Sequence, residues 1–420
     1  MERYLLQPTK SVHIHVSHQR KKGVSTPLFM NNDEIPSVQR AIHLGIIRTD
    51  SMLNNQKANV DENLKKARRK AYSIFGSGYK GQAGLNVLSI IHLYKSYVLP
   101  VLLYGLELLL PPERIINCLE AFQRKFVKEI LRLPDNTANA AVYLLSGLLP
   151  IEAQIHIQAL TFLHTICSQD RNSIEWALLE RQISFKSVDS SSWFIQVQHI
   201  MWKYELGTVA DLADNTPKKG KWKTRVLKAV HSYWSDQIDS LTPLYSTLFF
   251  LRQDKYVPGK ILPLLSLEYT ARESERLKTK VRLLTGTYML QTKRKNFNQY
   301  DINPTCQMCG EENETAEHFV LKCSALHSVR QSIMVDIERQ WGAITETSFN
   351  TLPVDEQLYI LINSWPTLKT FLKTHLSSEF HEFEKHCGRL LYGLDRTRQL
   401  LLVTNASQRP PRTKHTQKTN

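Results

Sequence analysis

Residues 55–78 read NQKANVDENLKKARRKAYSIFGSG, and this stretch sets the class of the fold. Its apolar residues recur every three or four positions, as they do on one face of an α-helix: Val60, Leu64, Ala67, Ala71, Ile74 and Phe75. Gly76 and Gly78 follow, where a helix of this length would end. The stretch therefore predicts a long amphipathic helix that packs one face against a core.

Further helices are predicted on the C-terminal side of this one. Apolar residues again recur at helical spacing, and the predicted helices cover residues 85–97, 111–131, 137–145 and 151–167. The first should close before Pro100, because a proline inside a helix removes a hydrogen bond and clashes with the preceding turn. Short connections favour side-by-side packing, so residues 55–168 are predicted to form a helical bundle.

The most apolar stretch of the chain, residues 90–110, lies within this bundle. Lys95, Pro100 and Glu107 divide it into runs that are too short to span a bilayer. We therefore interpret it as buried helix and expect no membrane partner.

The N-terminal side has the periodicity of strands. Residues 11–18, SVHIHVSH, alternate between apolar and polar, and two further extended segments are predicted near residues 28–30 and 41–47. Gly45 interrupts the last segment, which indicates a bulge or a close approach of another part of the chain. Residues 1–50 are predicted to be a small β region.

The C-terminal side is again helical. Residues 169–300 are predicted to be a helical linker, with an exposed turn at 214–221 and a basic helix at 272–284. The predicted C-terminal helices lie near 324–340, 354–375 and 378–400, within a region that covers residues 326–404. The tail, 405–420, is basic and contains Pro-Pro, so we expect it to be disordered.

Charge and cysteine content narrow the class of protein. Among 420 residues, 54 Lys and Arg stand against 39 Asp and Glu, a formal net charge of +15 that favours polyanions such as phosphate backbones or anionic membranes. Half of the six cysteines fall in one short window, unlike the framework of a disulfide-rich secreted domain. No signal peptide is recognisable at the N-terminus, so the nucleus or cytoplasm is the expected location.

That window, residues 301–325, contains CQMCGEENETAEHFVLKC from 306 to 323. Cys306 and Cys309 can chelate one ion from a tight turn, and His318 with Cys323 can complete a tetrahedral set if a helix begins near Thr315. Four protein ligands leave no position for water, so the predicted cofactor is a structural Zn²⁺. The alternative is a chance cluster of ordinary buried cysteines.

Two groups of cations are candidates for contact with nucleic acid. The first flanks the cysteine window, where Tyr288, Phe297 and Tyr300 lie among the cations Lys280, Arg282, Lys293, Arg294 and Lys295. Cations with aromatic rings are typical of single-strand sites, although a solvated helix face explains the group almost as well. The second group belongs to the long helix and could grip a duplex backbone, serve as a nuclear import signal or simply face solvent: Lys65, Lys66, Arg68, Arg69 and Lys70.

Several segments together resemble the C-terminal region of LINE-type (non-LTR) retrotransposon reverse transcriptases, over residues 1 to about 330. Besides the cysteine window they are QPTKS at 7–11, HLGI at 43–46, KKARRKAYSIFGSG at 65–78, YVLPVLLYGLELL at 97–109, LRLPDNTANAAVYLLSGLLPIEAQIH at 131–156 and LLTGTYML at 283–290.

The resemblance implies a placement for each part. Lys10 would lie at the end of the palm, at the position of a lysine that assists protonation of the leaving group. His43, Leu44 and Gly45 would belong to the primer-grip hairpin, and residues 55–168 would form the thumb. The helical linker and the CCHC zinc knuckle would then help to engage RNA and DNA.

The chain departs from the family at the catalytic centre. Polymerases hold two metal ions with paired aspartates, yet this sequence contains no Asp-Asp, and its first aspartate is Asp33. On the family's pattern Met1 would follow the catalytic hairpin, which implies a truncated element that has no polymerase activity by itself. The leading hypothesis is therefore non-catalytic binding of RNA or DNA.

Three alternatives stay open. An accessory part that acts with a separate catalytic reverse-transcriptase chain predicts an apolar, unpaired edge near residues 1–48. A zinc-stapled module that contacts only protein predicts that Lys280, Arg282, Lys293 and Arg294 do not form one positive surface. A relic without function would also expose apolar surface.

Overall fold

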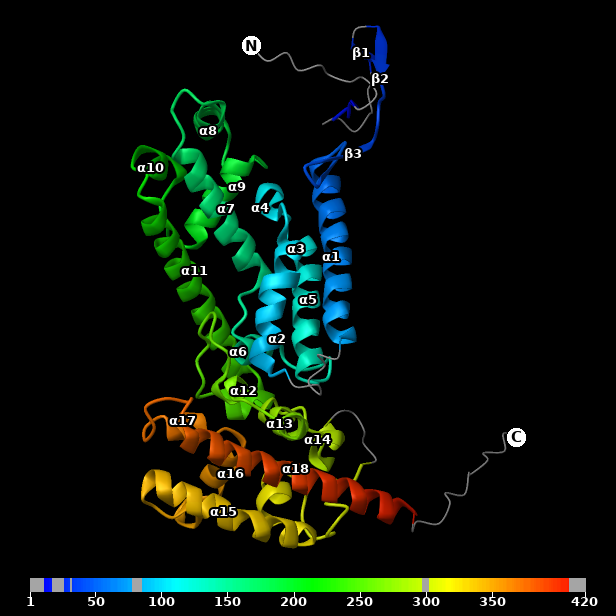
Figure 1. Ribbon diagram of the computed structural model, residues 1–420, viewed down its shortest axis with the longest axis vertical. Helices are drawn as coiled ribbons and strands as arrows, with labels where there is room; N and C mark the ends of the chain where they lie inside the picture. Colours follow the sequence, from blue (N-terminus) through cyan, green and yellow to red (C-terminus); the bar gives the residue numbers. More distant parts are fainter. Residues whose placement is uncertain (1–10, 17–25, 31, 78–84, 297–301, 408–420) are drawn as a thin grey trace, which may run out of the picture.

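A computed structural model of the chain describes residues 11–16, 26–30, 32–77, 85–296 and 302–407. These residues confirm a mainly helical fold with small β-hairpins near the N-terminus. Figure 1 shows an upper group of long, roughly upright helices and a lower group whose longest helices run across the first.

Two short antiparallel ribbons form the described N-terminal part. Strand β1 (Leu28–Met30) pairs with β2 (Asp33–Ile35), and β3 (Arg40–His43) pairs with β4 (Ile46–Thr49). The strand predicted at 11–18 is reduced, over its described residues 11–16, to a single bridge between His13 and Ser37.

The prediction of a single strand at 41–47 is wrong, because the segment folds back on itself as the β3–β4 hairpin. Leu44 and Gly45 have φ angles of 48° and 77°, and two successive left-handed residues reverse the chain in a two-residue turn. Of the two reasons predicted for Gly45, the close approach is the one found. A Cβ atom there would lie 3.1 Å from Cε1 of Tyr104.

Helix α1 (Met52–Gly76) is the predicted amphipathic helix, and it buries Val60, Ala67 and Ala71. The side chain of Ser51 caps its first turn by accepting a hydrogen bond from the Asn54 N–H. The polar residue Asn59, also buried, bonds both the N–H and the carbonyl of Ile47, which joins α1 to the hairpin.

The next helix does not close before Pro100, contrary to the prediction. Helix α2 (Val87–Leu93) continues through a π-helical turn (Tyr94–Val98) into α3 (Leu99–Leu103). The Leu99 N–H donates to the Tyr94 carbonyl, five residues back. This widened turn carries the helix past a proline that would clash with the carbonyl four residues earlier in a regular helix.

The rest of the bundle matches the predicted elements closely, apart from one short helix at 106–109 that was not predicted. It comprises α4 (Leu106–Leu109), α5 (Glu113–Ile130), α6 (Asn139–Ser146) and α7 (Ile151–Cys167). Among the described residues, Val87–Leu109 is long and apolar enough to cross a membrane by length and composition, and the bent pair α6 and α7 passes the same test together. Ile90, Tyr94 and Leu102 lie fully buried in the bundle core, and 39% of the most apolar window of this segment is buried, so the interpretation as buried helix holds for one face of it.

Residues 169–262 extend the bundle. Their helices are α8 (Ile174–Phe185), α9 (Trp193–Lys203), α10 (Val209–Asp214) and α11 (Lys219–Leu241). Helices α9 and α11 pack directly against α7, and the indole N–H of the buried Trp222 donates to the Leu160 carbonyl over 2.9 Å. The turn predicted at 214–221 is shorter than expected, since α11 begins at Lys219.

The lower group contains the remaining helices: α12 (Pro263–Ser266), α13 (Ala271–Leu284), α14 (Gln291–Asn296), α15 (His327–Thr345), α16 (Val354–Ile362), α17 (Trp365–Leu368) and α18 (Ser378–Ser407). The helix predicted at 354–375 is split at Asn363, whose side chain instead donates to the Phe250 carbonyl and the Asp254 carboxylate.

Helix α18 lies along both α13 and α15. These contacts cross the predicted boundaries at residues 300 and 325, so the cysteine window, the helices before it and the helices after it pack together. Because α18 continues to Ser407, the first residues of the predicted disordered tail are helical, and its remainder, 408–420, lies outside the described residues.

Candidate metal centre and nucleic-acid surface

Cys306, Cys309, His318 and Cys323 converge, as the spacing predicts. One donor atom from each lies within 4.8 Å of the other three. The Sγ atoms of Cys306 and Cys323 are 3.8 Å apart, and Cys309 Sγ is 3.3 Å from His318 Nε2. Two thiolates at tetrahedral angles, each about 2.3 Å from Zn²⁺, would be separated by about 3.8 Å. The four side chains therefore fit a single zinc ion.

The first two ligands lie on a turn that the glycine permits. The Gly310 N–H donates to the Cys306 carbonyl over 2.9 Å, and the Cys306 N–H donates to the Glu312 carbonyl over 2.7 Å. Gly310 has a φ angle of 75°, in the left-handed region that favours glycine. This closed loop holds both sulfur atoms on the same side.

The other two ligands come together through a π-helical turn (His318–Lys322). Positions five apart in a regular α-helix point about 140° away from each other. Here the Cys323 N–H reaches back to the His318 carbonyl over 2.7 Å, which widens the turn and places both side chains on one face. The helix predicted to begin near Thr315 is thus present, but its geometry is that of a π turn.

Partners outside the ligand set orient it. Glu312 Oε2 lies 3.3 Å from His318 Nδ1, so the carboxylate can hold that nitrogen and leave Nε2 for the ion. The Arg330 guanidinium donates to the carbonyls of Val320 and Cys323, each over 2.9 Å. Burial and, to a smaller extent, the neighbouring Cys306 together raise the pKa of the Cys323 thiol to about 12, so a metal ion must displace its proton.

A buried ion pair ties this loop to α14 and α18. Arg398 Nε donates to Glu314 Oε1 over 2.7 Å, and Arg398 Nη2 donates to Glu314 Oε2 over 3.0 Å. Glu314 Oε2 also accepts the Gln291 N–H, which begins α14. Sequence reasoning missed both Glu314 and Arg398, since residues 84 positions apart show no local pattern.

Two of the cations predicted to contact nucleic acid beside this window serve the protein itself. Lys280 is only 1% exposed, and its Nζ lies 2.5 Å from Glu384 Oε2 of α18, so its assignment to a nucleic-acid surface is wrong. The Arg282 guanidinium donates through Nε and Nη2 to the Arg132 carbonyl, over 3.1 and 2.9 Å. The basic helix α13 turns these side chains inward because it packs between the bundle and α18.

The three cations of α14 are less enclosed. Lys295 is exposed, whereas Lys293 and Arg294 are half-buried, and burial lowers the pKa of Lys293. Lys280, Arg282, Lys293 and Arg294 therefore do not form one continuous positive surface, as the protein-only alternative predicts.

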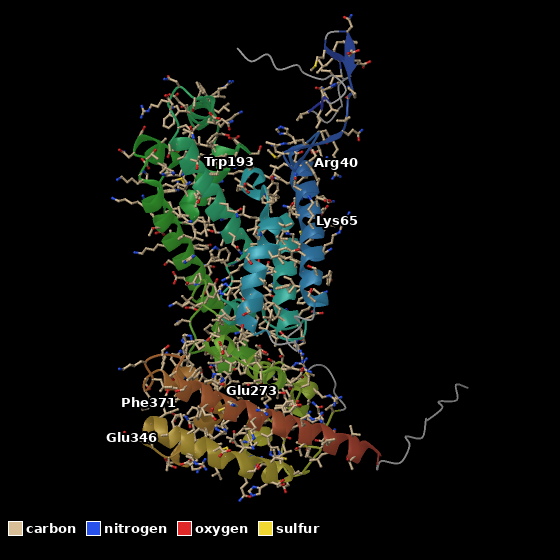
Figure 2. The ribbon with its side chains drawn as sticks, viewed as in Figure 1. Arg40, Lys65, Trp193, Glu273, Glu346 and Phe371 are labelled. Atoms are coloured by element: carbon tan, nitrogen blue, oxygen red, sulfur yellow. The ribbon has the colours of Figure 1, made fainter. Side chains whose placement is uncertain are left out.

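The basic residues of α1 are arranged differently. Lys65, Lys66, Arg68 and Arg69 are all exposed. Lys65 and Arg69 lie opposite the buried stripe of the helix, whereas Lys66 and Arg68 lie on its two flanks. Lys66 has a weak partner, with its Nζ 3.5 Å from Glu62 Oε1. Lys70 is half-buried, and its Nζ lies 4.0 Å from the centre of the Tyr97 ring. Figure 2 shows Lys65 on the outward side of α1.

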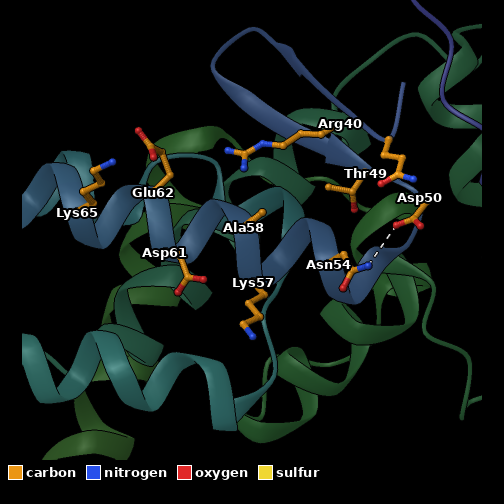
Figure 3. A pocket seen from close by; sticks show the side chains of 10 residues that line it. Arg40, Thr49, Asp50, Asn54, Lys57, Ala58, Asp61, Glu62 and Lys65 are labelled. Carbon is orange, nitrogen blue, oxygen red and sulfur yellow. Dashed lines mark hydrogen bonds between the residues drawn. The ribbon is translucent and has the colours of Figure 1, made fainter. Parts of the chain in front are cut away.

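A groove of about 510 Å³ runs between the β3–β4 hairpin and α1 (Figure 3). Arg40 from the hairpin and Lys57 and Lys65 from α1 line it, together with the acids Asp50, Asp61 and Glu62. The sequence indicated no groove, because it exists only where the hairpin lies over the helix.

The hairpin turn lies at the other end of the β3–β4 ribbon from Arg40 and Thr49, which line the groove. His43, Leu44 and Gly45 are exposed there, and the Leu44 carbonyl accepts the Tyr104 hydroxyl over 2.9 Å. A hairpin is thus present where the resemblance implies one, and its role in gripping a primer stays a prediction. Lys10 lies outside the described residues.

Comparisons of the chain with protein-family models, with curated proteins and with solved structures found no match.

Proposed function

We propose that this chain binds RNA or DNA without catalysing a reaction, and that the outward face of α1 makes the principal contact. The observation that carries the proposal is the grouping of Lys65, Lys66, Arg68 and Arg69 on the exposed side of a helix whose other side is buried. Lys65 and Arg69, one turn apart on the same face, can each neutralise a phosphate, and the released counterions drive binding.

Charge and chemistry support the same function. The net charge of +15 attracts polyanions over the whole chain, whereas the groove beside α1 is charge-balanced, since Asp50, Asp61 and Glu62 offset Arg40, Lys57 and Lys65. The absence of an Asp-Asp pair from the sequence argues against two-metal polymerase chemistry. The resemblance to the thumb of non-LTR reverse transcriptases adds to the case for α1 as the contact.

The zinc site would have a supporting role in this function. Its four protein ligands close the coordination sphere, so the ion would stabilise the fold and take no part in catalysis. Since Lys280 and Arg282 make internal contacts, the predicted cations that remain available beside the cysteine window are those of α14, chiefly the exposed Lys295.

Lys65→Ala with Arg69→Ala should weaken binding to a duplex DNA and to an RNA in fluorescence anisotropy. If both side chains contact phosphates of the duplex, the slope of log K against log salt should fall by about 0.9 for each lost contact. Lys219→Ala with Lys221→Ala is the matched control, because it removes two exposed cations from α11 instead. If both double variants lost the same affinity, binding would reflect the net charge of the chain and not a contact by α1. If the unmodified chain did not bind at low salt, the proposal would be refuted.

A second candidate function rests on exposed apolar side chains of the hairpins. Phe29, Ile42 and Leu44 are 61%, 69% and 78% exposed, which matches the apolar edge expected if a separate catalytic chain packs there. On this proposal the chain supplies the thumb of a reverse transcriptase whose palm belongs to another polypeptide.

The second candidate predicts that this chain binds a palm-and-fingers fragment of a non-LTR reverse transcriptase and restores its primer extension. Ile42→Asp with Leu44→Asp should weaken that binding at least tenfold, measured by surface plasmon resonance, because two charges would be desolvated at the contact. Ile174→Asp with Leu178→Asp, on the exposed face of α8, is the control and should have no effect. Failure of the unmodified chain to bind the fragment would exclude this candidate.

A further inference from the structure

A cleft of about 590 Å³ opens between the upper and lower groups of helices. One wall is the segment 253–263, which leads into α12, and the other is formed by α17 and the residues after it, as far as Leu376. Leu88 and Leu144 of the bundle also line it. This volume lies within the range of about 300–1,000 Å³ that is usual for small-molecule sites.

The first wall is held in place by backbone hydrogen bonds to the end of α6. The Gly259 N–H donates to the Gly147 carbonyl over 2.7 Å, and the Leu262 N–H donates to the Leu145 carbonyl over 3.1 Å. Gly147 has a φ angle of 61°, and a Cβ atom there would lie 2.1 Å from the Lys260 carbonyl oxygen. This wall is therefore pre-formed, so binding a ligand need not order it.

The opposite wall presents aromatic surface. Trp365 packs edge-on against Phe380 on one side and against His375 on the other, with ring centroids 5.1 and 5.5 Å away. Trp365 stays partly exposed toward the cleft, together with Leu376. Across from them lie Val257 and Leu262, so a flat or extended apolar group would have apolar contacts on both sides.

Cations predominate at the rim of the cleft. Of its three lysines, Lys255 has an ion partner in Asp239, 3.7 Å away. Burial raises the pKa of Asp254 to about 6, and the nearby Lys369 offsets only part of that rise. Asp254 is also held by the Asn363 amide over 2.6 Å. Among the described residues Lys260 has no acidic partner within ion-pair distance, and its charge, after burial, helps to lower the pKa of His375.

We propose that this cleft binds a small amphipathic anion, in which an apolar ring system or chain carries a carboxylate or sulfonate. The apolar body would lie between Trp365 and Leu262, and the anionic group would pair with Lys260. A cationic ligand would meet an unpartnered like charge at the rim, and a neutral ligand would forgo the ion pair. The site is separate from the basic face of α1, so it can be tested independently of nucleic-acid binding.

The probes 1-anilinonaphthalene-8-sulfonate and N-phenyl-1-naphthylamine test the proposal, because they share an apolar body and differ in the sulfonate. Lys260→Ala should weaken the sulfonate probe about tenfold, the loss expected for a charged hydrogen bond, and leave the neutral probe unchanged. Lys373→Ala removes an exposed lysine that does not line the cleft and should affect neither probe. Decanoate, an aliphatic carboxylate, should displace the sulfonate probe.

Val257→Trp provides the second variant, since it would fill the cleft from a partly exposed position and should remove binding of both probes. Unchanged thermal unfolding would show that this variant and Lys260→Ala are folded. Probe binding that is insensitive to Val257→Trp would place the probes elsewhere and overturn the proposal. Equal affinities of Lys260→Ala and the unmodified chain for the sulfonate probe would overturn it as well.

Discussion

Replacing Cys306 or Cys323 with serine should abolish the binding of one zinc ion per chain and unfold the region around the site. Both side chains are buried within the cluster, so each substitution removes one of the four atoms that could bind the ion. Structural zinc contributes about 10–16 kcal/mol of apparent binding free energy in zinc-finger peptides, more than the whole stability of most domains. Loss of the ion is therefore the largest destabilisation we expect in this chain.

Mass spectrometry of the native protein measures the zinc stoichiometry, and hydrogen exchange locates the unfolding. Exchange should rise across residues 302–345, where the ligands and the helix anchored by Arg330 lie, and should rise less in α5 and α7. Cys118→Ser is the control, because it removes an exposed thiol outside the cluster. A Cys306→Ser protein with unchanged zinc content and protection would show that the cluster is four ordinary side chains.

The second large effect concerns the ion pair between α13 and α18. Lys280→Ala should lower the free energy of unfolding by about 3–5 kcal/mol, because it leaves the Glu384 carboxylate buried without its counter-charge. Ser364, which donates its hydroxyl to Glu384, cannot replace the lost charge. Urea denaturation followed by circular dichroism measures the change.

A control and a compensating variant separate this cause from others. Lys385 pairs with Glu273 across the same two helices, 3.5 Å apart. Because the Lys385 side chain is 44% exposed and Glu273 keeps its hydrogen bonds to Thr270, Lys385→Ala should cost no more than about 1 kcal/mol. Lys280→Met combined with Glu384→Leu should recover most of the loss, since neither charge then remains buried. If Lys280→Ala left the stability unchanged but weakened nucleic-acid binding, Lys280 would contact nucleic acid after all.

Local pattern predicted the helices of the bundle well. The bounds of α7 were predicted to the residue, and those of α1 and α5 nearly so, because the apolar period and the flanking glycines and prolines are themselves the causes of these helices. Periodicity alone missed the hairpin at 40–49, which only the resemblance implied, because apolar residues stand on both sides of the two-residue turn at Leu44 and Gly45 and read as one strand. The prediction that a helix ends before Pro100 was wrong for a different reason: a π-helical turn lets the helix continue past the proline.

The candidate metal site was predictable for a similar reason. Ligand identity and spacing are local properties of 18 consecutive residues, so the sequence indicated all four side chains that the fold brings together. It did not indicate Glu314 and Arg398, which hold that loop against α18. Nor could it show which cations face solvent, since a basic helix looks the same whether its lysines meet water or a buried carboxylate.

By itself the sequence determined the helical class, the α1 amphipathic face and the set of four metal ligands. All three depend on residues close together in the chain, whose geometry the backbone period imposes. Tertiary structure alone decided that Lys280 is buried, that a groove lies beside α1 and that a cleft separates the two helix groups. Each of these arises where segments distant in sequence pack together. Such contacts depend on which distant side chains meet, and this produces no periodic pattern in the sequence.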